Sequence, residues 1–380
     1  MNEVLSNSLK NDHGTKILSL DGGGLRGILT LGILKRLESQ IQGHYGASQR
    51  LCDYFDIIGG TSTGSIIASG LAIGKSVDEL IALYQTLGAE IFGKGLLGRW
   101  TRGWTNMRAF NRENYDSRKL EKYLKSKDAF GDIAMGDQEN IYCGLVINTK
   151  RADTYSLWSI GNHPDGKYYE ANRDLKLWEL TKASSSAPYY FKPTALNVKS
   201  RTGKKSRSAF IDGGVSLANN PVWQLFLVST VPSFGFERKI GEAEMSVFSI
   251  GTGKGIPGAA PEKLLKKRAI SWAPALPDLF MVDALEMNQT IMSAFGKNIA
   301  DEVYSDSQYG AMDDVEYVKP KLFSFQRYDV AFDDATINKK LKLGLTDQQL
   351  QGLSQMDHVE NMDSWLKIGK AYAEGVQFKV

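Results

Sequence analysis

The sequence predicts an α/β protein in which a mostly parallel central sheet is flanked by helices. Three observations predict this class. Apolar strands alternate with amphipathic helices through the first half of the chain, glycine-rich turns join strands to helices, and the chain after Gly253 becomes mainly helical. The chain has 380 residues, of which 42% are hydrophobic, and this is enough to bury a large core.

The individual elements follow from residue spacing. Apolar side chains that recur at helical spacing indicate helices, and short apolar runs indicate strands. The expected strands are residues 17–20, 54–58, 141–148, 154–159, 209–211 and 245–250. The expected helices include residues 27–42, 65–72 and 175–185, and a further helix capped by Ser76, with Glu79 completing a capping box. Residues 199–208 (KSRTGKKSRS) are polar and basic, which is typical of a solvated loop or hairpin tip.

Composition restricts the function classes. The formal net charge is only +3, so we expect no DNA or RNA polymer as a partner. The N-terminal residues lack the basic start and apolar run of a secretion signal, and no long uninterrupted apolar segment is present, so we expect a soluble cytoplasmic protein. Cys52 and Cys143 lie in apolar surroundings and are expected to be buried free thiols.

The first motif is DGGGLRG at residues 21–27, between an expected strand and an expected helix. Its glycines permit a tight turn and leave backbone N–H groups uncovered, so the loop suits a phosphate or the oxyanion of an acyl-transfer intermediate. Gly22, Gly24 and Gly27 also fit the GxGxxG spacing of dinucleotide-binding proteins, which leaves a nucleotide-dependent oxidoreductase as an alternative. That fold normally has an acidic residue at the end of the next strand, whereas this strand runs into Gly59-Gly60.

The second motif favours acyl transfer. Residues 60–64 read GTSTG, a GxSxG sequence between an expected strand and helix. A serine at so sharp a turn has a strained backbone, and a glycine two residues away on each side relieves the crowding. In this context we interpret Ser62 as a nucleophile.

The third motif is Asp212-Gly213-Gly214, which follows an expected strand and precedes ANNP at residues 218–221. Alone, an Asp-Gly pair indicates only a turn. Together with the other two motifs, Asp212 becomes a candidate base for the serine, and burial would raise its proton affinity.

In this order and spacing, the three motifs resemble those of the patatin-like phospholipase family, over about residues 16–221. The resemblance implies a three-layer patatin-like fold and a lipid acyl hydrolase that cleaves fatty acyl esters of membrane phospholipids at the inner face of the membrane. Residues 16–222 would form the catalytic core. Residues 223–380 would supply the remainder of the core and a largely helical C-terminal extension that acts as a lid or a regulatory region.

The family's roles carry over residue by residue. They are Ser62 as nucleophile, Asp212 as its base, Gly22, Gly23 and Gly24 as oxyanion-hole donors, and Gly60 and Gly64 as the elbow glycines. Arg26 matches the arginine of the family's loop and is expected to hold either the loop or a substrate phosphate. Residues 187–191 (APYYF) also resemble a family segment near the site.

One alternative concerns the catalytic base. A triad of Ser62, Asp212 and His358 would use a histidine as base. His358 lies in QMDHVENMD, which is typical of an exposed polar helix, so we favour the dyad.

No histidines have metal-ligand spacing to cysteine or carboxylate, so we expect neither a metal nor another cofactor. A non-catalytic lipid- or nucleotide-binding or storage protein on the same fold is the alternative from another class.

Regulation is suggested by two segments that mix aromatic and basic residues. Residues 96–112 (LLGRWTRGWTNMRAFNR) suit an anionic membrane surface, a nucleotide or a plain solvated loop, and Lys266-Lys267-Arg268 precede Trp272. The chain is also similar in size and layout to bacterial patatin-like effectors of anti-phage operons, which implies a cyclic di- or trinucleotide as activator. A constitutive, non-specific lipid acyl hydrolase is the alternative, and homo-oligomer formation is left open.

Overall fold

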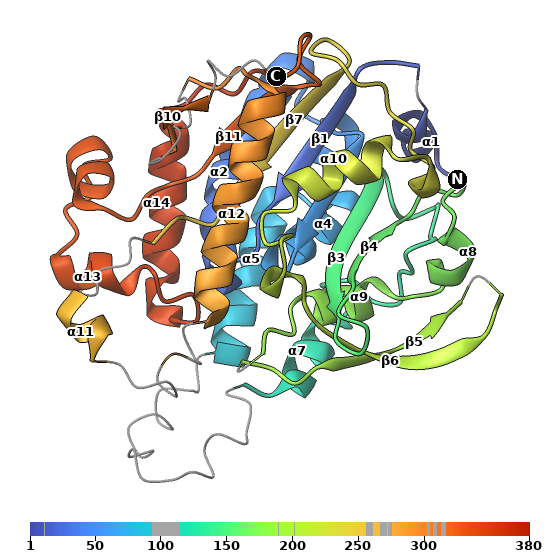
Figure 1. Cartoon of the computed structure of the whole chain (residues 1–380), viewed down its shortest axis with the longest axis horizontal. Helices are drawn as coiled ribbons and strands as arrows, with labels where there is room; N and C mark the ends of the chain where they lie inside the picture. Colours follow the sequence, from blue (N-terminus) through green and yellow to red (C-terminus); the bar gives the residue numbers. More distant parts are fainter. Residues whose placement is uncertain are drawn as a thin grey trace.

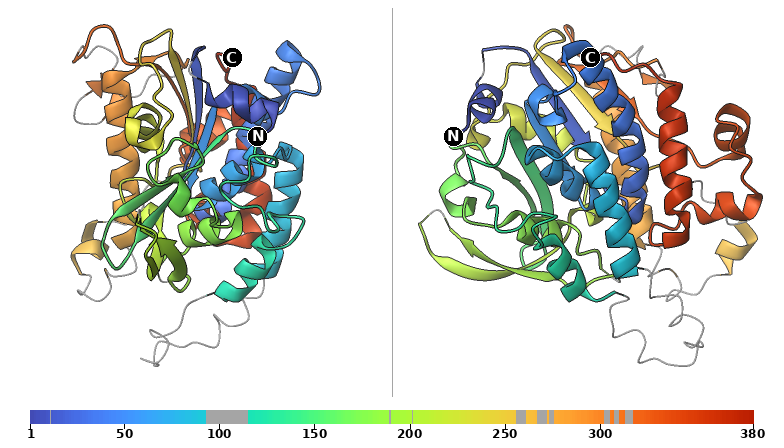
Figure 2. Two further views of the ribbon diagram at one scale, coloured as in Figure 1. Left: turned by 90° about the vertical axis from the view of Figure 1, so that its right-hand side faces the viewer. Right: turned by 180° about the vertical axis from the view of Figure 1, so that it is seen from behind.

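Helices cover both faces of one central sheet in the computed structural model of the chain (Figures 1 and 2). The structure describes residues 1–10, 12–92, 115–188, 190–200, 202–255, 261–266, 272, 276–301, 305–306, 310–312 and 317–380. The predicted α/β class, with a mostly parallel sheet, is therefore confirmed.

Within this part of the chain, the strands of the main sheet lie in the order β5-β6-β3-β2-β1-β7-β11-β8, and β4 also pairs with β3. The strands are β1 (Thr15–Leu20), β2 (Ile57–Thr61), β3 (Gly144–Arg151), β4 (Leu157–Gly161), β5 (Thr194–Lys199), β6 (Lys205–Asp212), β7 (Met245–Ile250), β8 (Lys297–Asn298) and β11 (Ser324–Tyr328). From β3 to β8 all neighbours along this order are parallel, whereas β4 and β6 run antiparallel to β3, and β5 antiparallel to β6. A separate pair joins β9 (Ser305–Asp306) to β10 (Gly310–Ala311).

The helices alternate with these strands along the chain. They are α1 (Glu3–Leu9), α2 (Gly27–Tyr45), α3 (Leu51–Tyr54), α4 (Thr63–Ala72), α5 (Val77–Leu87), α7 (Ser117–Leu124), α8 (Tyr169–Asn172), α9 (Leu177–Ser184), α10 (Val222–Thr230), α11 (Pro261–Leu265), α12 (Leu276–Phe295), α13 (Asp347–Gly352) and α14 (Met362–Glu374). Short 3-10 or π segments include η1 (Gly24–Arg26), η2 (Gly88–Phe92), η4 (Gly213–Val215) and η10 (Val359–Asn361). The predicted capping box of α5 is present, with Ser76 and Glu79 bonded reciprocally.

The sheet separates two apolar cores. Helices α2, α4, α5 and α14 pack on one face, and α10 and α12 pack on the other (Figure 2). Neighbouring side chains of a strand point to opposite faces. Leu18 of β1 accordingly lies in the first core and Ile17 in the second, and both are fully buried. This two-sided burial explains why the central strands are apolar without alternation.

The C-terminal helix is held to the first half of the chain by a close helix–helix contact. A Cβ atom at Gly369 of α14 would lie 2.2 Å from the carbonyl oxygen of Leu29 in α2, and one at Gly32 would lie 2.9 Å from the carbonyl oxygen of Leu366. Glycine at both positions lets the two backbones approach closely. Helix α14 therefore packs directly on the helix that follows the glycine loop.

One predicted loop is shorter in the structure. Residues 199–208 were expected to form a solvated loop or hairpin tip, but β5 extends to Lys199 and β6 begins at Lys205, so part of this range belongs to the two strands of the hairpin. The region after Gly253 is largely helical, as expected, with α11, α12, α13 and α14, and it also contributes β11, which extends the main sheet beside β7. Cys52 and Cys143 are buried and free, as predicted. Among the described residues, no helix is long and apolar enough to cross a membrane.

Candidate active site

Ser62 lies at a strained turn between β2 and α4. Its backbone has φ 54° and ψ −124°, a conformation that residues other than glycine rarely adopt. The elbow glycines are required by packing. A Cβ atom at Gly60 would lie 2.2 Å from the backbone of Gly64, and one at Gly64 would lie 2.2 Å from the carbonyl oxygen of Leu20. The turn at Ser62 therefore packs the start of α4 directly against the end of β1.

Buried polar contacts hold this turn in place. The N–H of Ser62 donates to Oγ of Ser184 at 2.8 Å, and that hydroxyl donates in turn to the carbonyl of Asn148 at 2.6 Å. The carbonyl of Ser62 accepts the hydroxyl of Ser65 at 2.6 Å. Strained backbone persists only where its surroundings over-determine it, and these bonds do so on both sides of the residue. The sequence showed no signal for Ser184 or Asn148, because their roles depend on contacts between distant segments.

Asp212 ends β6, and its carboxylate faces Ser62. The hydroxyl of Ser62 donates to Oδ2 at 2.6 Å, and the N–H of Gly214 donates to Oδ1 at 2.6 Å. The side chain is buried, and burial raises the pKa of Asp212 to about 7, although both hydrogen bonds act to lower it. A carboxylate with a pKa near neutrality is a far better proton acceptor than a solvated aspartate.

The glycine loop lies against Ser62. A Cβ atom at Gly22 would lie 3.3 Å from Cβ of Ser62. The N–H of Gly22 donates to the carbonyl of Asn219 at 2.9 Å, so the expectation that Gly22 offers a free oxyanion donor needs correction. The N–H groups of Gly23 and Gly24 have no acceptor among the described residues. The predicted donors are therefore reduced to these two glycines.

Arg26 contacts the loop itself. Its Nε donates to the carbonyl of Gly23 at 3.4 Å, a long hydrogen bond within one turn of helix η1. The carbonyl of Gly22 accepts the hydroxyl of Thr252, which follows β7, at 3.0 Å. Gly24 has φ +61°, and its neighbour Leu25 donates its N–H to the carbonyl of Met356 at 2.9 Å. The loop is thus held by residues from the second half of the chain, Thr252 and Met356, that the sequence did not identify.

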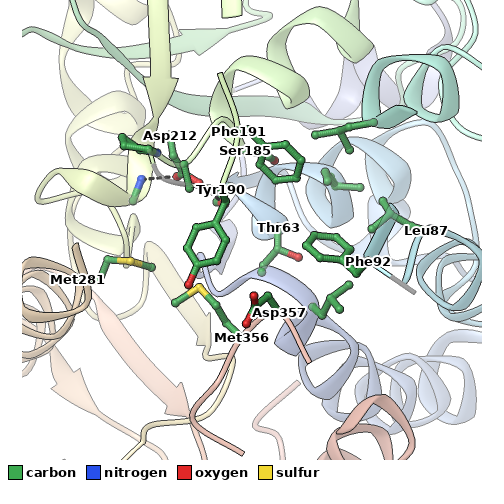
Figure 3. A pocket seen from close by; sticks show the side chains of 18 of the residues that line it. Thr63, Leu87, Phe92, Ser185, Tyr190, Phe191, Asp212, Met281, Met356 and Asp357 are labelled. Carbon is green, nitrogen blue, oxygen red and sulfur yellow. Dashed lines mark hydrogen bonds between the residues drawn. The ribbon is translucent and has the colours of Figure 1, made fainter. Parts of the chain in front are cut away.

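An apolar pocket opens beside Ser62 and Asp212 (Figure 3). Its apolar lining comprises Leu25, Ile66, Leu87, Phe92, Leu120, Ala187, Pro188, Phe191, Val215, Met281 and Met356, and Tyr84, Tyr190 and Asp357 also line it. In Figure 3, Met281 and Asp212 lie to the left of the pocket, and Leu87 and Phe92 lie to its right. The APYYF segment thus lines the pocket, although Tyr189 lies outside the described residues.

The C-terminal region contributes to the pocket in a way that the sequence did not predict. The QMDHVENMD segment was expected to be an exposed helix, but Met356 and Asp357 precede η10 and line the pocket. Asp357 accepts the hydroxyl of Tyr115 at 2.8 Å.

The two mixed aromatic and basic segments fall largely outside the part of the chain that the structure describes, since residues 96–112, 267 and 268 are not among the described residues.

The geometry does not favour the triad. Ser62 donates directly to Asp212 with no histidine between them. His358 does not line the pocket, and its Nδ1 lies 3.1 Å from the carboxylate of Glu360. In the described part of the chain, no group of histidine, cysteine and acidic residues is arranged to hold a metal ion. The acidic residue expected of a dinucleotide site is also missing from the end of β2, which ends at Thr61 and is followed by Ser62.

Fold and site together define an α/β protein that presents a strained serine, paired with a buried carboxylate, at the carboxyl end of a central parallel strand. The chain belongs to the patatin-like phospholipase family, whose model matches residues 18–226. Patatin-17 from Solanum cardiophyllum is 27% identical over 252 residues, which is 62% of this chain and 60% of that protein. Patatin-1-Kuras 2 from Solanum tuberosum is 26% identical over 250 residues, covering 62% of each chain.

The chain thus spans about 60% of the length of the first of these relatives. A solved structure of human GIVD cytosolic phospholipase A2 aligns with 97% of this chain and 60% of that chain, at 10% identity and a TM-score of 0.48. Family membership rests on the sequence match and not on this structural likeness.

Proposed function

We propose that the protein is a lipid acyl hydrolase of the phospholipase A type that uses Ser62 and Asp212 as a catalytic dyad. The observation that carries this proposal is the 2.6 Å hydrogen bond from the Ser62 hydroxyl to the buried carboxylate of Asp212, beside an apolar pocket. Family membership supports the same class of reaction.

In the proposed first step, Asp212 takes the hydroxyl proton of Ser62 while Oγ attacks the ester carbonyl carbon. The oxyanion that forms accepts hydrogen bonds from the N–H groups of Gly23 and Gly24. When the intermediate collapses, the bond to the alcohol oxygen breaks, and Asp212 returns its proton to that leaving oxygen. The products of this step are the free alcohol and an acyl ester on Ser62.

In the second step, Asp212 takes a proton from water, which attacks the acyl-enzyme. A second tetrahedral intermediate collapses, the proton returns to Oγ of Ser62, and the fatty acid leaves. One carboxylate serves as base and then acid in both steps, which suits a pKa of about 7 at Asp212.

The pocket favours an acyl chain over a polar substrate. Its volume of about 70 Å³ is small beside the roughly 300 Å³ or more of typical ligand pockets, so a long chain requires the wall to move. Met281 and Met356 line the pocket, and methionine side chains repack readily. We propose membrane phospholipid as the source of the ester, with Arg26 holding the glycine loop.

The test is release of free fatty acid from mixed phospholipid vesicles and from a soluble short-chain ester. Wild type is compared with Ser62→Ala, Asp212→Ala and His358→Ala. We expect activity to be lost in the first two variants and retained in the third. Activity that survives Ser62→Ala would exclude the proposed nucleophile, and loss in a folded His358→Ala variant would replace the dyad with a triad. A wild type that binds lipid and cleaves neither substrate would support the non-catalytic alternative.

Activation by a cyclic nucleotide stays a prediction that rests on the overall resemblance of the chain. The same vesicle assay, repeated with a panel of cyclic di- and trinucleotides, tests it. The effector hypothesis predicts low activity until one nucleotide is added. High activity with no response to any of them would support the constitutive hydrolase instead.

A further inference from the structure

A buried ion-pair network adjoins the start of the glycine loop. The carboxylate of Asp21 accepts hydrogen bonds from Arg327, with Nη1 at 3.0 Å from Oδ1 and Nη2 at 2.7 Å from Oδ2. Nη2 also donates to Oδ2 of Asp329 at 2.8 Å, and Nη1 donates to the hydroxyl of Ser249 at 2.8 Å. The side chain of Asp21 has 0% exposure and that of Arg327 has 6%.

Arg327 reaches Asp21 across an intervening strand. Strand β7 pairs with β1 on one side and β11 on the other, and Ser249 of β7 is the register partner of both Ser19 and Arg327. Asp21 directly follows β1. The guanidinium therefore ties the first residue of the glycine loop to a strand that lies two positions away in the sheet and 306 residues later in the chain.

The network also reaches the loop from a second direction. Oδ1 of Asp329 accepts the N–H of Gly253 at 2.9 Å, and the adjacent Thr252 donates its hydroxyl to the carbonyl of Gly22 at 3.0 Å. A Cβ atom at Gly251 would lie 2.2 Å from the side chain of Asp329, so the turn after β7 fits closely around that carboxylate. Asp21 and Gly22, two successive residues of the glycine loop, are thus positioned by one connected set of hydrogen bonds.

Stability alone is a weak explanation for this network. Moving ions out of water is costly, and apolar replacements of buried ion pairs are often as stable. Here one guanidinium faces two carboxylates, and burial raises the pKa of Asp21 to about 6 even though Arg327 acts to lower it. A planar bidentate contact, however, restricts orientation in a way that an apolar contact does not.

We propose that Arg327, itself held by Asp329, is a positioning residue for acyl transfer: it orients Asp21 and thereby aims the N–H groups of Gly23 and Gly24 at the oxyanion. This inference rests on the proposed function, because it requires an oxyanion at Ser62. A misplacement of about 1 Å in an active site can lower the rate by roughly 10²-fold, so a small rotation of the loop is sufficient.

The experiment compares Arg327→Met, Arg327→Lys and Asp329→Asn with wild type. The matched control is Arg50→Met, which removes another bidentate pair, Arg50 with Asp53, that does not line the pocket. Four quantities are measured: the melting temperature, kcat and KM on a soluble short-chain ester, and the affinity for an alkyl trifluoromethyl ketone. Such a ketone adds the serine oxygen to form an oxyanion, and the corresponding methyl ketone, which adds it far less readily, serves as the reference.

Arg327→Met is expected to lower kcat by about 10²-fold while KM changes by less than about threefold. In Arg327→Met, the affinity for the trifluoromethyl ketone should fall in parallel with kcat, whereas the affinity for the methyl ketone should not change. Arg50→Met should alter neither kcat nor the affinity for either ketone. A purely structural role would change the melting temperature and leave the ketone selectivity of the folded enzyme intact.

Wild-type kcat and ketone selectivity in folded Arg327→Met would overturn this inference. If that variant does not fold, Arg327→Lys and Asp329→Asn decide by the same two measurements, since both retain most of the network's volume. Ser62→Ala separates the two levels of the proposal. Ester hydrolysis that persists in Ser62→Ala removes the proposed function, whereas its loss there, together with normal Arg327 variants, removes only the positioning role.

Discussion

Thr149 of β3 is the register partner of Asp212 of β6, and this pairing is antiparallel. The residue before it, Asn148, is the parallel partner of Thr61, which precedes Ser62. Strand β3 therefore extends past the end of β2, and β6 approaches that end from outside the parallel sheet. The last residue of β6, Asp212, therefore lies beside the start of the Ser62 turn, and its carboxylate is 2.6 Å from Ser62 Oγ.

Replacing Asp212 by asparagine tests the base without changing side-chain size. The amide can still accept the N–H of Gly214 and donate to Ser62, but it cannot take the hydroxyl proton. We expect kcat on a soluble ester to fall by about 10⁴-fold while the fold is retained, as for comparable losses in serine hydrolases. Steady-state kinetics and circular dichroism check this, and a loss smaller than about tenfold would show that another group acts as base.

Activity should depend on pH through Asp212. Only the ionised carboxylate accepts a proton, and the pKa of Asp212 is about 7 because the side chain is buried. For a soluble ester, kcat/KM is therefore expected to rise as the pH increases and to level off above about pH 7. A profile with its inflection near the ordinary aspartate value of 3.8 would mean that the side chain is hydrated in the working enzyme.

Ionisation of Asp212, which the proposed activity requires, lowers the stability of the folded protein. The pKa is raised in the folded protein, so the folded state binds this proton more tightly than the unfolded chain, and the resulting stabilisation is lost as the pH rises from 3.8 through about 7. Asp212→Asn, which has no charge to bury, should be more stable than wild type above pH 7, by on the order of 4 kcal/mol. Denaturant unfolding at several pH values measures the difference, which should shrink toward acidic pH.

The elbow glycines should tolerate no side chain. Gly64→Ala would place a methyl group 2.2 Å from the carbonyl oxygen of Leu20, and rigid backbone at both sides cannot yield. We expect this variant either to unfold or to lose Ser62 reactivity toward a fluorophosphonate probe. Gly43→Ala in α2 is the control, since a Cβ atom there meets nothing within 4 Å. It should be stabilised by about 0.5–1 kcal/mol, and an equally stable, reactive Gly64→Ala would contradict the elbow geometry.

Filling the pocket should change chain-length preference. Ile66 of α4 and Leu87 of α5 are buried and line the pocket, so phenylalanine at either position should narrow it. We expect kcat/KM for long-chain esters to fall by at least about tenfold, while short-chain esters are affected little. Leu83→Phe is the matched control, because Leu83 is buried in the same helix as Leu87 and does not line the pocket. Equal losses for both ester classes would place the acyl chain elsewhere.

Local features of the site could be predicted from the sequence because their causes are local. The turn around Ser62 needs small residues at fixed offsets, and the glycine loop needs an uncovered backbone, so both leave motifs in consecutive residues. Strand β7 was predicted at its observed bounds, Met245–Ile250, because a strand buried on both faces is a continuous apolar run.

Only the tertiary structure decided which groups meet. The N–H of Gly22 is occupied by Asn219, the pocket is completed by Met356 and Asp357, and Asp21 is paired with Arg327. None of these contacts has a local cause, since each joins segments brought together by strand order and helix packing. The sequence by itself determined the motifs on which the proposed chemistry rests. The direction of β6 and the position of β11 determined where Asp212 and the contacts of the glycine loop lie, because the hydrogen-bonding partners of a strand can come from any part of the chain.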